Sequence, residues 1–140
     1  MVTANYNTGL IAAAEYGLNP EVHIYRSKTK ELAYSFKMDT TVKCIGMVFS
    51  RDGKYLLMIG GVPDFKISIF DVELNKKIVM PETKLPCKPE EFISAKFNPS
   101  NKNQFCILSQ QVLYMFIIHQ AYEVTENGDD QTLGDSFRLE

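Results

Sequence analysis

Residues 45–54 read Ile45-Gly46-Met47-Val48-Phe49-Ser50-Arg51-Asp52-Gly53-Lys54, and they contain the turn that decides the fold. Apolar runs at 43–49 and 55–59 flank Arg51-Asp52-Gly53. Asp-Gly between two such runs is a strong short-range signal of a β-hairpin. The same pattern, an Ile, a Phe four residues later and a polar turn that ends in Lys, returns at residues 93–102, an offset of 48.

Further segments repeat with nearly the same spacing. Val22-His23-Ile24-Tyr25, Ile67-Ser68-Ile69-Phe70 and Leu113-Tyr114-Met115-Phe116 match one another at offsets of 45 and 46, and Leu10-Ile11 corresponds to Tyr55-Leu56. A unit of four short strands repeated about every 45 residues is the sequence signature of a β-propeller blade. The sequence therefore predicts an all-β chain built of four-stranded antiparallel blades.

The remaining sequence agrees with strands rather than helices. Nine Phe and seven Tyr, together with plentiful Val, Ile and Thr, favour strand structure, although Trp is absent. The proline-studded stretch 81–89 cannot lie inside a central strand. Strands are expected at 10–14, 21–25, 31–36, 43–49, 55–59, 66–70, 77–80, 92–97, 104–108 and 112–118.

Length conflicts with closure of a propeller. The chain of 140 residues holds about two and a half to three blades, whereas closed propellers have roughly four to eight. Residues 1–119 are thus expected to form part of an incomplete propeller, with Tyr25, Phe70 and Phe116 filling the space between blades. The remaining blades would come from the same or another polypeptide. The alternative is a small β-sandwich or barrel whose repeat is coincidental.

The last 21 residues differ from the rest in charge. Residues 1–119 carry fourteen Lys and Arg against eleven Asp and Glu, whereas residues 120–140 carry one Arg against six acidic residues. Residues 126–131 also lack hydrophobic periodicity. This composition predicts an acidic polar tail or linker over 120–140.

Composition also bounds the compartment and the partners. The three cysteines, Cys44, Cys87 and Cys106, have no C-x-x-C spacing, so buried free thiols are expected rather than disulfides or a zinc site. The net charge of −2 argues against a dedicated nucleic-acid binder, and no apolar run approaches the length of a membrane span. We expect a soluble intracellular protein without nucleic-acid or membrane partners.

No pattern of catalytic or cofactor-binding residues is present in the sequence. His23 and His119 lack Cys, Asp or Glu at metal-ligand spacing, and Glu90-Glu91 follow a proline in a surface connector. Gly60-Gly61 is not followed by a phosphate-binding Lys-Ser/Thr pair. We expect no enzyme activity, metal or cofactor; the alternative of an enzymatic or ligand-binding β domain would require a pocket with convergent polar groups.

Two segments resemble WD repeats. Residues 48–56, Val48-Phe49-Ser50-Arg51-Asp52-Gly53-Lys54-Tyr55-Leu56, are similar to the family's strand–turn–strand core, and Phe70-Asp71 stands where Trp-Asp ends the third strand. The Gly-His opening is absent, and Tyr25-Arg26 and Phe116-Ile117 lack the Asp. These departures put in doubt the Asp-His-Ser/Thr-Trp hydrogen-bond tetrad of strong WD repeats.

Three motifs within residues 8–118 resemble the family of cilia- and flagella-associated proteins 43 and 44: residues 18–25, 61–70 with Pro63-Asp64-Phe65, and 96–101 with Phe97-Asn98-Pro99. These are large WD-repeat proteins of the axoneme. The resemblance implies a scaffold in the cytoplasm and cytoskeleton of the cilium or flagellum, whose full-length chain adds a coiled coil. The implied partners are dynein arm and tether components and tubulin, and the implied role is to tether inner dynein arm motor domains to doublet microtubules.

By analogy with WD propellers, the loops between second and third strands and between blades are expected to contact partners. The residues concerned are Asn19, Pro20, Pro63, Asp64 and Phe65 in loops, and Lys84 and Lys88 in a connector. A general WD-repeat interaction domain outside cilia is the alternative within the same fold.

Overall fold

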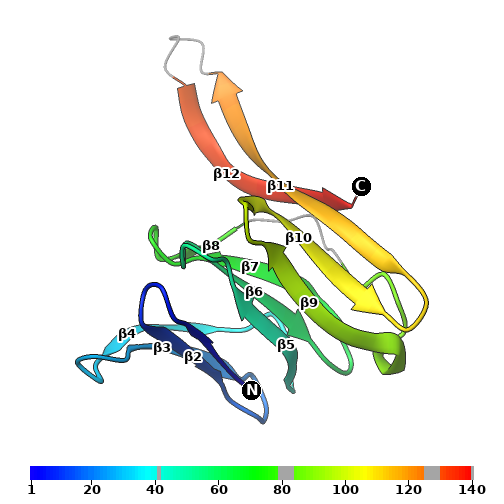
Figure 1. The fold of residues 1–140 in the computed structure, drawn as a ribbon, viewed down its shortest axis with the longest axis horizontal. Helices are drawn as coiled ribbons and strands as arrows, with labels where there is room; N and C mark the ends of the chain where they lie inside the picture. The colour runs from blue at the N-terminus through cyan, green and yellow to red at the C-terminus, as the bar shows by residue number, and fades with distance from the viewer. Residues whose placement is uncertain (41, 79–83, 125–129, 140) are drawn as a thin grey trace.

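The computed structural model describes residues 1–40, 42–78, 84–124 and 130–139, and their side chains over 1–40, 42–78 and 84–119. These residues form three four-stranded antiparallel sheets, each with its strands in sequence order (Figure 1). We call the sheets blades I, II and III. Since each strand pairs with the next along the chain, short turns make most connections within a blade.

The strands of each blade have the following bounds. Blade I contains β1 (Val2–Asn5), β2 (Leu10–Ala14), β3 (Glu21–Arg26) and β4 (Leu32–Lys37). Blade II contains β5 (Cys44–Phe49), β6 (Tyr55–Gly60), β7 (Ile67–Asp71) and β8 (Lys76–Lys77). Blade III contains β9 (Phe92–Asn98), β10 (Asn101–Ser109), β11 (Leu113–Val124) and β12 (Asp130–Leu139), preceded by a single 3₁₀ turn, η1 (Pro89–Glu91).

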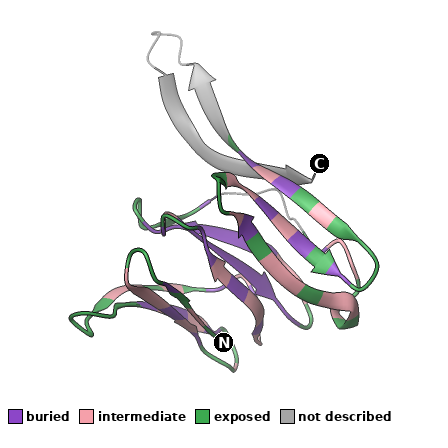
Figure 2. Ribbon diagram, in the orientation of Figure 1, coloured by how far each residue is buried: buried purple, intermediate pink, exposed green. Residues whose placement is uncertain are grey.

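The blades stack face to face, with blade II in the middle. The first strands lie side by side, since β5 contacts both β1 and β9. All six residues of β6 and all five of β7 are buried, as the purple colour of the middle sheet in Figure 2 shows. A strand covered on both faces needs apolar side chains throughout, which explains the unbroken run Tyr55-Leu56-Leu57-Met58-Ile59.

Two hydrophobic cores fill the spaces on either side of blade II. Leu56, Met58 and Phe70 pack with residues of blade I, and Phe36 stacks on Phe70 with ring centroids 3.8 Å apart. Tyr55, Leu57, Ile59 and Ile69 pack with residues of blade III, where Phe105 and Phe116 stack at 4.7 Å. Alternate residues of one strand therefore serve two cores.

The three aromatic positions of the repeat differ in burial. Phe70 and Phe116 are 3% and 1% exposed, and both lie on the face of their blade that meets the preceding blade. Tyr25, expected in the core, is instead 36% exposed. The reason is its place in the repeat, because the corresponding face of blade I has no preceding blade over it in the described part of the chain.

Two strands were not expected from the sequence. β1 completes blade I and β12 completes blade III, so blades that seemed to have three strands have four. Within the segment predicted as an acidic tail or linker, β11 continues to Val124, and β12 pairs with it from Phe116↔Leu139 to Val124↔Asp130. Backbone pairing along the free edge of β11 requires no apolar alternation, which is why the sequence pattern did not reveal it. The division of the chain at residue 119 stays a prediction.

Candidate functional site: two loop ends of the blades

Loops gather at two opposite ends of the blades because every strand reverses direction. One end, called the Pro63 end, carries the β2–β3, β6–β7 and β10–β11 loops and the connectors between blades. The other, called the Arg51 end, carries the β1–β2, β3–β4, β5–β6, β7–β8 and β9–β10 turns. Backbone hydrogen bonds join the loops and connectors of the Pro63 end, for example Gly17 N–H to Val42 O at 3.0 Å and Gly61 N–H to Lys43 O at 2.8 Å.

At the Pro63 end, the β6–β7 loop is held against the connector between blades II and III. The Phe65 N–H donates to Gly61 O at 3.0 Å, and the Leu85 N–H donates to Phe65 O at 2.7 Å. Lys66 and Lys84 form an isolated β-bridge beside these bonds. The predicted contact residues of loop and connector are therefore neighbours in space, although about twenty residues separate them in sequence.

A hollow of about 400 Å³ lies between this loop and the start of blade III. Apolar side chains of Val62, Phe65 and Phe92 and the polar groups of Lys43 and Glu90 line it. Nearby, burial and then the charge of Glu91 raise the pKa of the Cys87 thiol, which disfavours its reactive thiolate. The hollow offers shape and apolar contact rather than a nucleophile.

The structure places the predicted contact residues in different surroundings. Asn19, Pro63, Lys84 and Lys88 are exposed, Asp64 and Phe65 are half-buried, and Pro20 is buried. Asn19 and Phe65 adopt positive φ, at 53° and 45°, and the peptide before Pro63 is cis. All belong to the Pro63 end, and their role in binding stays a prediction.

The sequence-based reasoning did not single out the Arg51 end, where side chains connect the blades. The buried side chain of Asn5 donates from Nδ2 to Ser50 O at 2.6 Å and to Arg51 O at 3.1 Å. Asn7 Nδ2 makes a third hydrogen bond to this turn, also to Arg51 O, at 2.9 Å. The β5–β6 turn of blade II is thus fixed to blade I through its backbone carbonyls.

An ion pair joins the same turn to blade III. Lys102 Nζ lies 3.0 Å from Asp52 Oδ2, while Ser50 Oγ donates to Asp52 Oδ1 at 2.7 Å. Burial alone would raise the pKa of Asp52, but the bonds from Ser50, Lys102 and the Lys54 N–H together hold it below its usual value. The hydrogen bond to Asp52 raises the pKa of Lys102. Both groups therefore stay charged near neutral pH.

Asp71, at the position of the family's Asp, supports this end from inside. It is completely buried, and its Oδ1 accepts the Leu74 N–H at 2.9 Å in the β7–β8 turn. Lys54 Nζ lies 3.8 Å from Oδ2 and 4.9 Å from the Tyr55 ring centroid. The Asp71 carboxylate therefore stabilises the β7–β8 turn.

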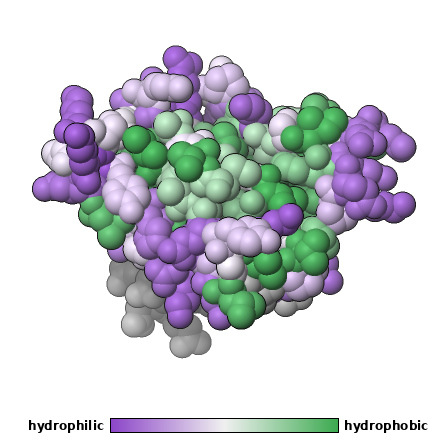
Figure 3. Space-filling view, turned by 90° about the horizontal axis from the view of Figure 1, so that it is seen from below, coloured by the Kyte–Doolittle hydropathy of each residue, from purple (hydrophilic) through white to green (hydrophobic). Residues whose placement is uncertain are grey.

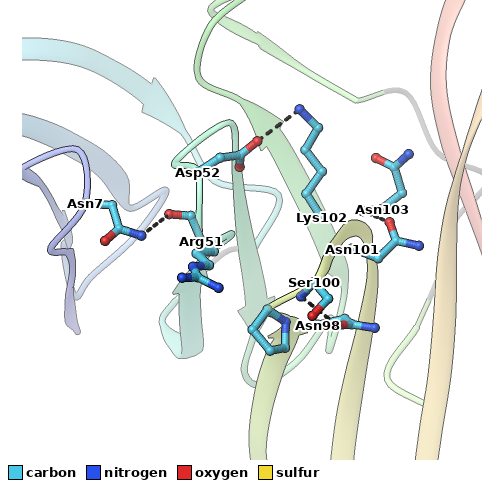
Figure 4. A pocket seen from close by; sticks show the side chains of 9 residues that line it. Asn7, Arg51, Asp52, Asn98, Ser100, Asn101, Lys102 and Asn103 are labelled. Atoms are coloured by element: carbon cyan, nitrogen blue, oxygen red, sulfur yellow. Dashed lines mark hydrogen bonds and ion pairs between the residues drawn. The ribbon is translucent and has the colours of Figure 1, made fainter.

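Figure 4 shows the hollow of about 520 Å³ that these turns surround. Asn7, Arg51 and Asp52 line one side, and the β9–β10 turn with Asn98, Ser100 and Lys102 lines the other. One signal in the sequence could have revealed it: the repeat offsets align residue 7 with 52 and 52 with 100, so their turns must share one end. Among the described residues, no three His, Cys, Asp or Glu side chains could together hold a metal ion.

Comparisons with known proteins bear on the fold. No protein-family model matches the chain, and no curated protein matches its sequence. Among solved structures, Hsv2 of Kluyveromyces lactis matches with a TM-score of 0.72 and 12% identity over 100% of this chain and 45% of that chain. Hsv2 of Kluyvelomyces marxianus matches with a TM-score of 0.70 and 11% identity, over 99% of this chain and 44% of that one.

The β-propeller domain of Cps50 (Swd1) from Myceliophteria thermophila matches with a TM-score of 0.62 and 19% identity, over 95% of this chain and 37% of that chain. The chain thus spans less than half the length of each of these structures. A search of the described helices found none long and apolar enough to cross a membrane. Three separate sheets and these likenesses exclude the small sandwich or barrel, and the fold is an incomplete β-propeller of three blades.

Proposed function

We propose that this chain is part of a non-catalytic WD-repeat scaffold of the ciliary axoneme, in which the propeller mediates protein–protein contacts. Further blades, from the same or another polypeptide, would cover the outer faces of blades I and III. Other axonemal proteins would then bind the loops of the Pro63 end.

The burial of equivalent positions in the repeat supports the proposal that further blades cover the outer faces of blades I and III. Ile24 and Ile69 face the next blade and are 0% exposed, whereas Met115, at the same position of blade III, is 40% exposed. Tyr25 is exposed on the opposite, outer face of blade I. Side chains are therefore exposed on both outer faces at positions whose equivalents in blade II are buried. This is expected if further blades of a longer stack cover those faces.

The outer faces have the composition of covered surfaces. Figure 3 views the molecule from below Figure 1 and shows hydrophobic atoms gathered in the middle of the surface, with hydrophilic side chains around them. On blade III, Leu113 is 54% exposed and pairs with Leu108, which is 38% exposed. Large exposed apolar patches in soluble proteins usually mark interfaces.

The charge of the Pro63 end supports a protein partner with an acidic surface. Lys84 and Lys88 are exposed beside the apolar hollow, on a connector fixed to the β6–β7 loop. Such a rim suits electrostatic attraction to acidic proteins such as tubulin. The axonemal setting, in the tether of inner dynein arms, follows from the resemblance of residues 18–25, 61–70 and 96–101.

The proposal can be tested on the full-length protein in ciliated cells. A tagged chain should localise to the axoneme and stay bound after detergent extraction. Lys84→Glu with Lys88→Glu should release it at lower salt, because the charge of the rim is reversed. Lys28→Glu with Lys30→Glu, an equal charge change in the exposed β3–β4 turn, is the matched control and should not alter the salt dependence.

Each outcome separates one part of the proposal. Localisation elsewhere in the cell would contradict the axonemal role and favour a general WD-repeat interaction domain. Equal salt sensitivity of the two double variants would contradict binding through the Pro63 end. For the outer faces, Met115→Asp should destabilise the full-length protein, and no change in its unfolding midpoint would show that no blade covers blade III.

A further inference from the structure

The hollow at the Arg51 end combines the cationic side chain of Arg51 with asparagine amides from blades I and III. Arg51 is exposed, and its guanidinium makes no hydrogen bond or ion pair within the described residues, while its carbonyl accepts bonds from Asn5 and Asn7. Because those bonds hold the Arg51 backbone, only the side chain retains freedom. A guanidinium with five unused donors, on a backbone that is held in place, fits a carboxylate in bidentate geometry.

The rest of the lining can hydrogen-bond but adds little charge. Asp52 and Lys102 neutralise each other at 3.0 Å, so Arg51 supplies the net charge of the hollow. Asn101 Oδ1 accepts the Asn103 N–H at 3.0 Å, which orients its side chain. No hydrogen bond within the described residues uses the side-chain N–H groups of Asn101 and Asn103, and both residues line the hollow.

We propose that this hollow binds an acidic peptide segment of a partner protein, with a carboxylate on Arg51 and the peptide backbone on the asparagine amides. Asparagine side chains offer both donors and acceptors, as a peptide backbone requires. A fully ionised phosphate has no hydrogen-bond donors, so it would leave the asparagine carbonyl oxygens of the lining without a partner on the ligand. The site lies at the end opposite the Pro63 loops and does not depend on the axonemal assignment.

The hollow is also preorganised, which favours binding. Blade I contributes Asn7, blade II contributes Arg51 and Asp52, and blade III contributes Lys102, and hydrogen bonds or an ion pair join each to a neighbour. A ligand therefore does not have to order these turns when it binds. The hollow has a volume of about 520 Å³, which fits a few residues of an extended peptide or turn.

The test is an NMR titration of the isotope-labelled chain with a six-residue peptide of alternating Glu and Gly, blocked at both ends, in 150 mM salt. The amide resonances of residues 51–52 and 98–103 should shift and saturate. Arg51→Gln should raise the Kd about tenfold. Arg51→Lys should raise it less, because lysine keeps the charge and loses only the two parallel N–H donors of the guanidinium. Arg26→Gln, an equal charge loss at an exposed residue outside the hollow, should leave the Kd unchanged.

Three results would overturn the proposal. An equal rise of the Kd in Arg26→Gln and Arg51→Gln would show general electrostatic attraction. An equal Kd for the matching Gln-Gly peptide would show that the site does not recognise the carboxylate. Inorganic phosphate that shifts the same resonances at lower concentration than the peptide would show an anion site instead of a peptide site. In Arg51→Gln, the amide resonances of residues outside the hollow should be unchanged, which excludes unfolding as the cause of lost binding.

Discussion

Removal of the Asn5 side chain tests whether the Arg51 end holds blades I and II together. Asn5 is 7% exposed, and its side chain makes four hydrogen bonds. Its Nδ2 donates to Ser50 O and Arg51 O, and its Oδ1 accepts the N–H groups of Asn7 and Thr8 at 2.9 and 3.0 Å. Each such bond contributes roughly 0.5–1.5 kcal/mol, and an unpaired buried carbonyl costs about 1–3 kcal/mol.

Asn5→Ala should therefore lower the free energy of unfolding by about 2–4 kcal/mol. With a urea m-value of about 1.5 kcal/mol per molar, the unfolding midpoint should fall by about 2 M, followed by circular dichroism. Asn5→Asp keeps the two accepting bonds but turns a carboxylate toward two carbonyl oxygens, so its loss should be at least as large. Asn103 lies at the same end, and within the described residues its side chain makes no hydrogen bond across blades, so Asn103→Ala should change stability by less than about 0.5 kcal/mol. Equal losses in Asn5→Ala and Asn103→Ala would refute the reasoning.

Three further predictions follow from single residues. Lys102→Met should raise the pKa of Asp52, measured by NMR. Since folding depresses that pKa, the Asp52–Lys102 pair stabilises the folded state above about pH 4, and this contribution is lost as pH falls through the folded-state pKa. Gly53→Ala should destabilise the fold by about 1–3 kcal/mol, because φ is +75° and a Cβ would lie 2.6 Å from Thr8 Cγ2; Thr8→Ala should relieve only part of this loss. Burial raises the pKa of Cys44, so iodoacetamide should modify it far more slowly in the native protein than in urea, and equal rates would contradict its burial.

The sequence revealed the parts of the fold that depend on apolar alternation. The expected strand at 10–14 is β2, and the hairpin around Arg51-Asp52-Gly53 forms as expected between β5 and β6. β1 and β12 were missed because a four-residue strand with Asn5 at its end, and a ten-residue strand whose only apolar residues are Leu133, Phe137 and Leu139, carry little hydrophobic signal. Their place is set by backbone pairing with a neighbour, which no side-chain period encodes.

The candidate sites were predictable to different degrees. Analogy selected the loops of the Pro63 end, and the structure brings the Phe65 loop and the Lys84 connector together. The Arg51 end depends on side chains such as Asn7 and Lys102, which are 95 positions apart in the sequence. Only the stacking of blades brings them to one hollow, and asparagine-rich turns are too common in sequences to indicate a site.

The outer face of blade I carries a polar cluster, which bears on whether another blade could cover it. His23 Nε2 lies 3.1 Å from Glu15 Oε1, and Ser35 Oγ lies 3.0 Å from His23 Nδ1. The hydrogen bond to His23 and that from the Glu21 N–H lower the pKa of Glu15. Because these groups already have partners within the face, covering them costs less than covering unpaired polar groups. The cluster is therefore compatible with a preceding blade over Tyr25, and it would fix how that blade sits, because an apolar side chain placed over Glu15 would remove the water around a charged carboxylate.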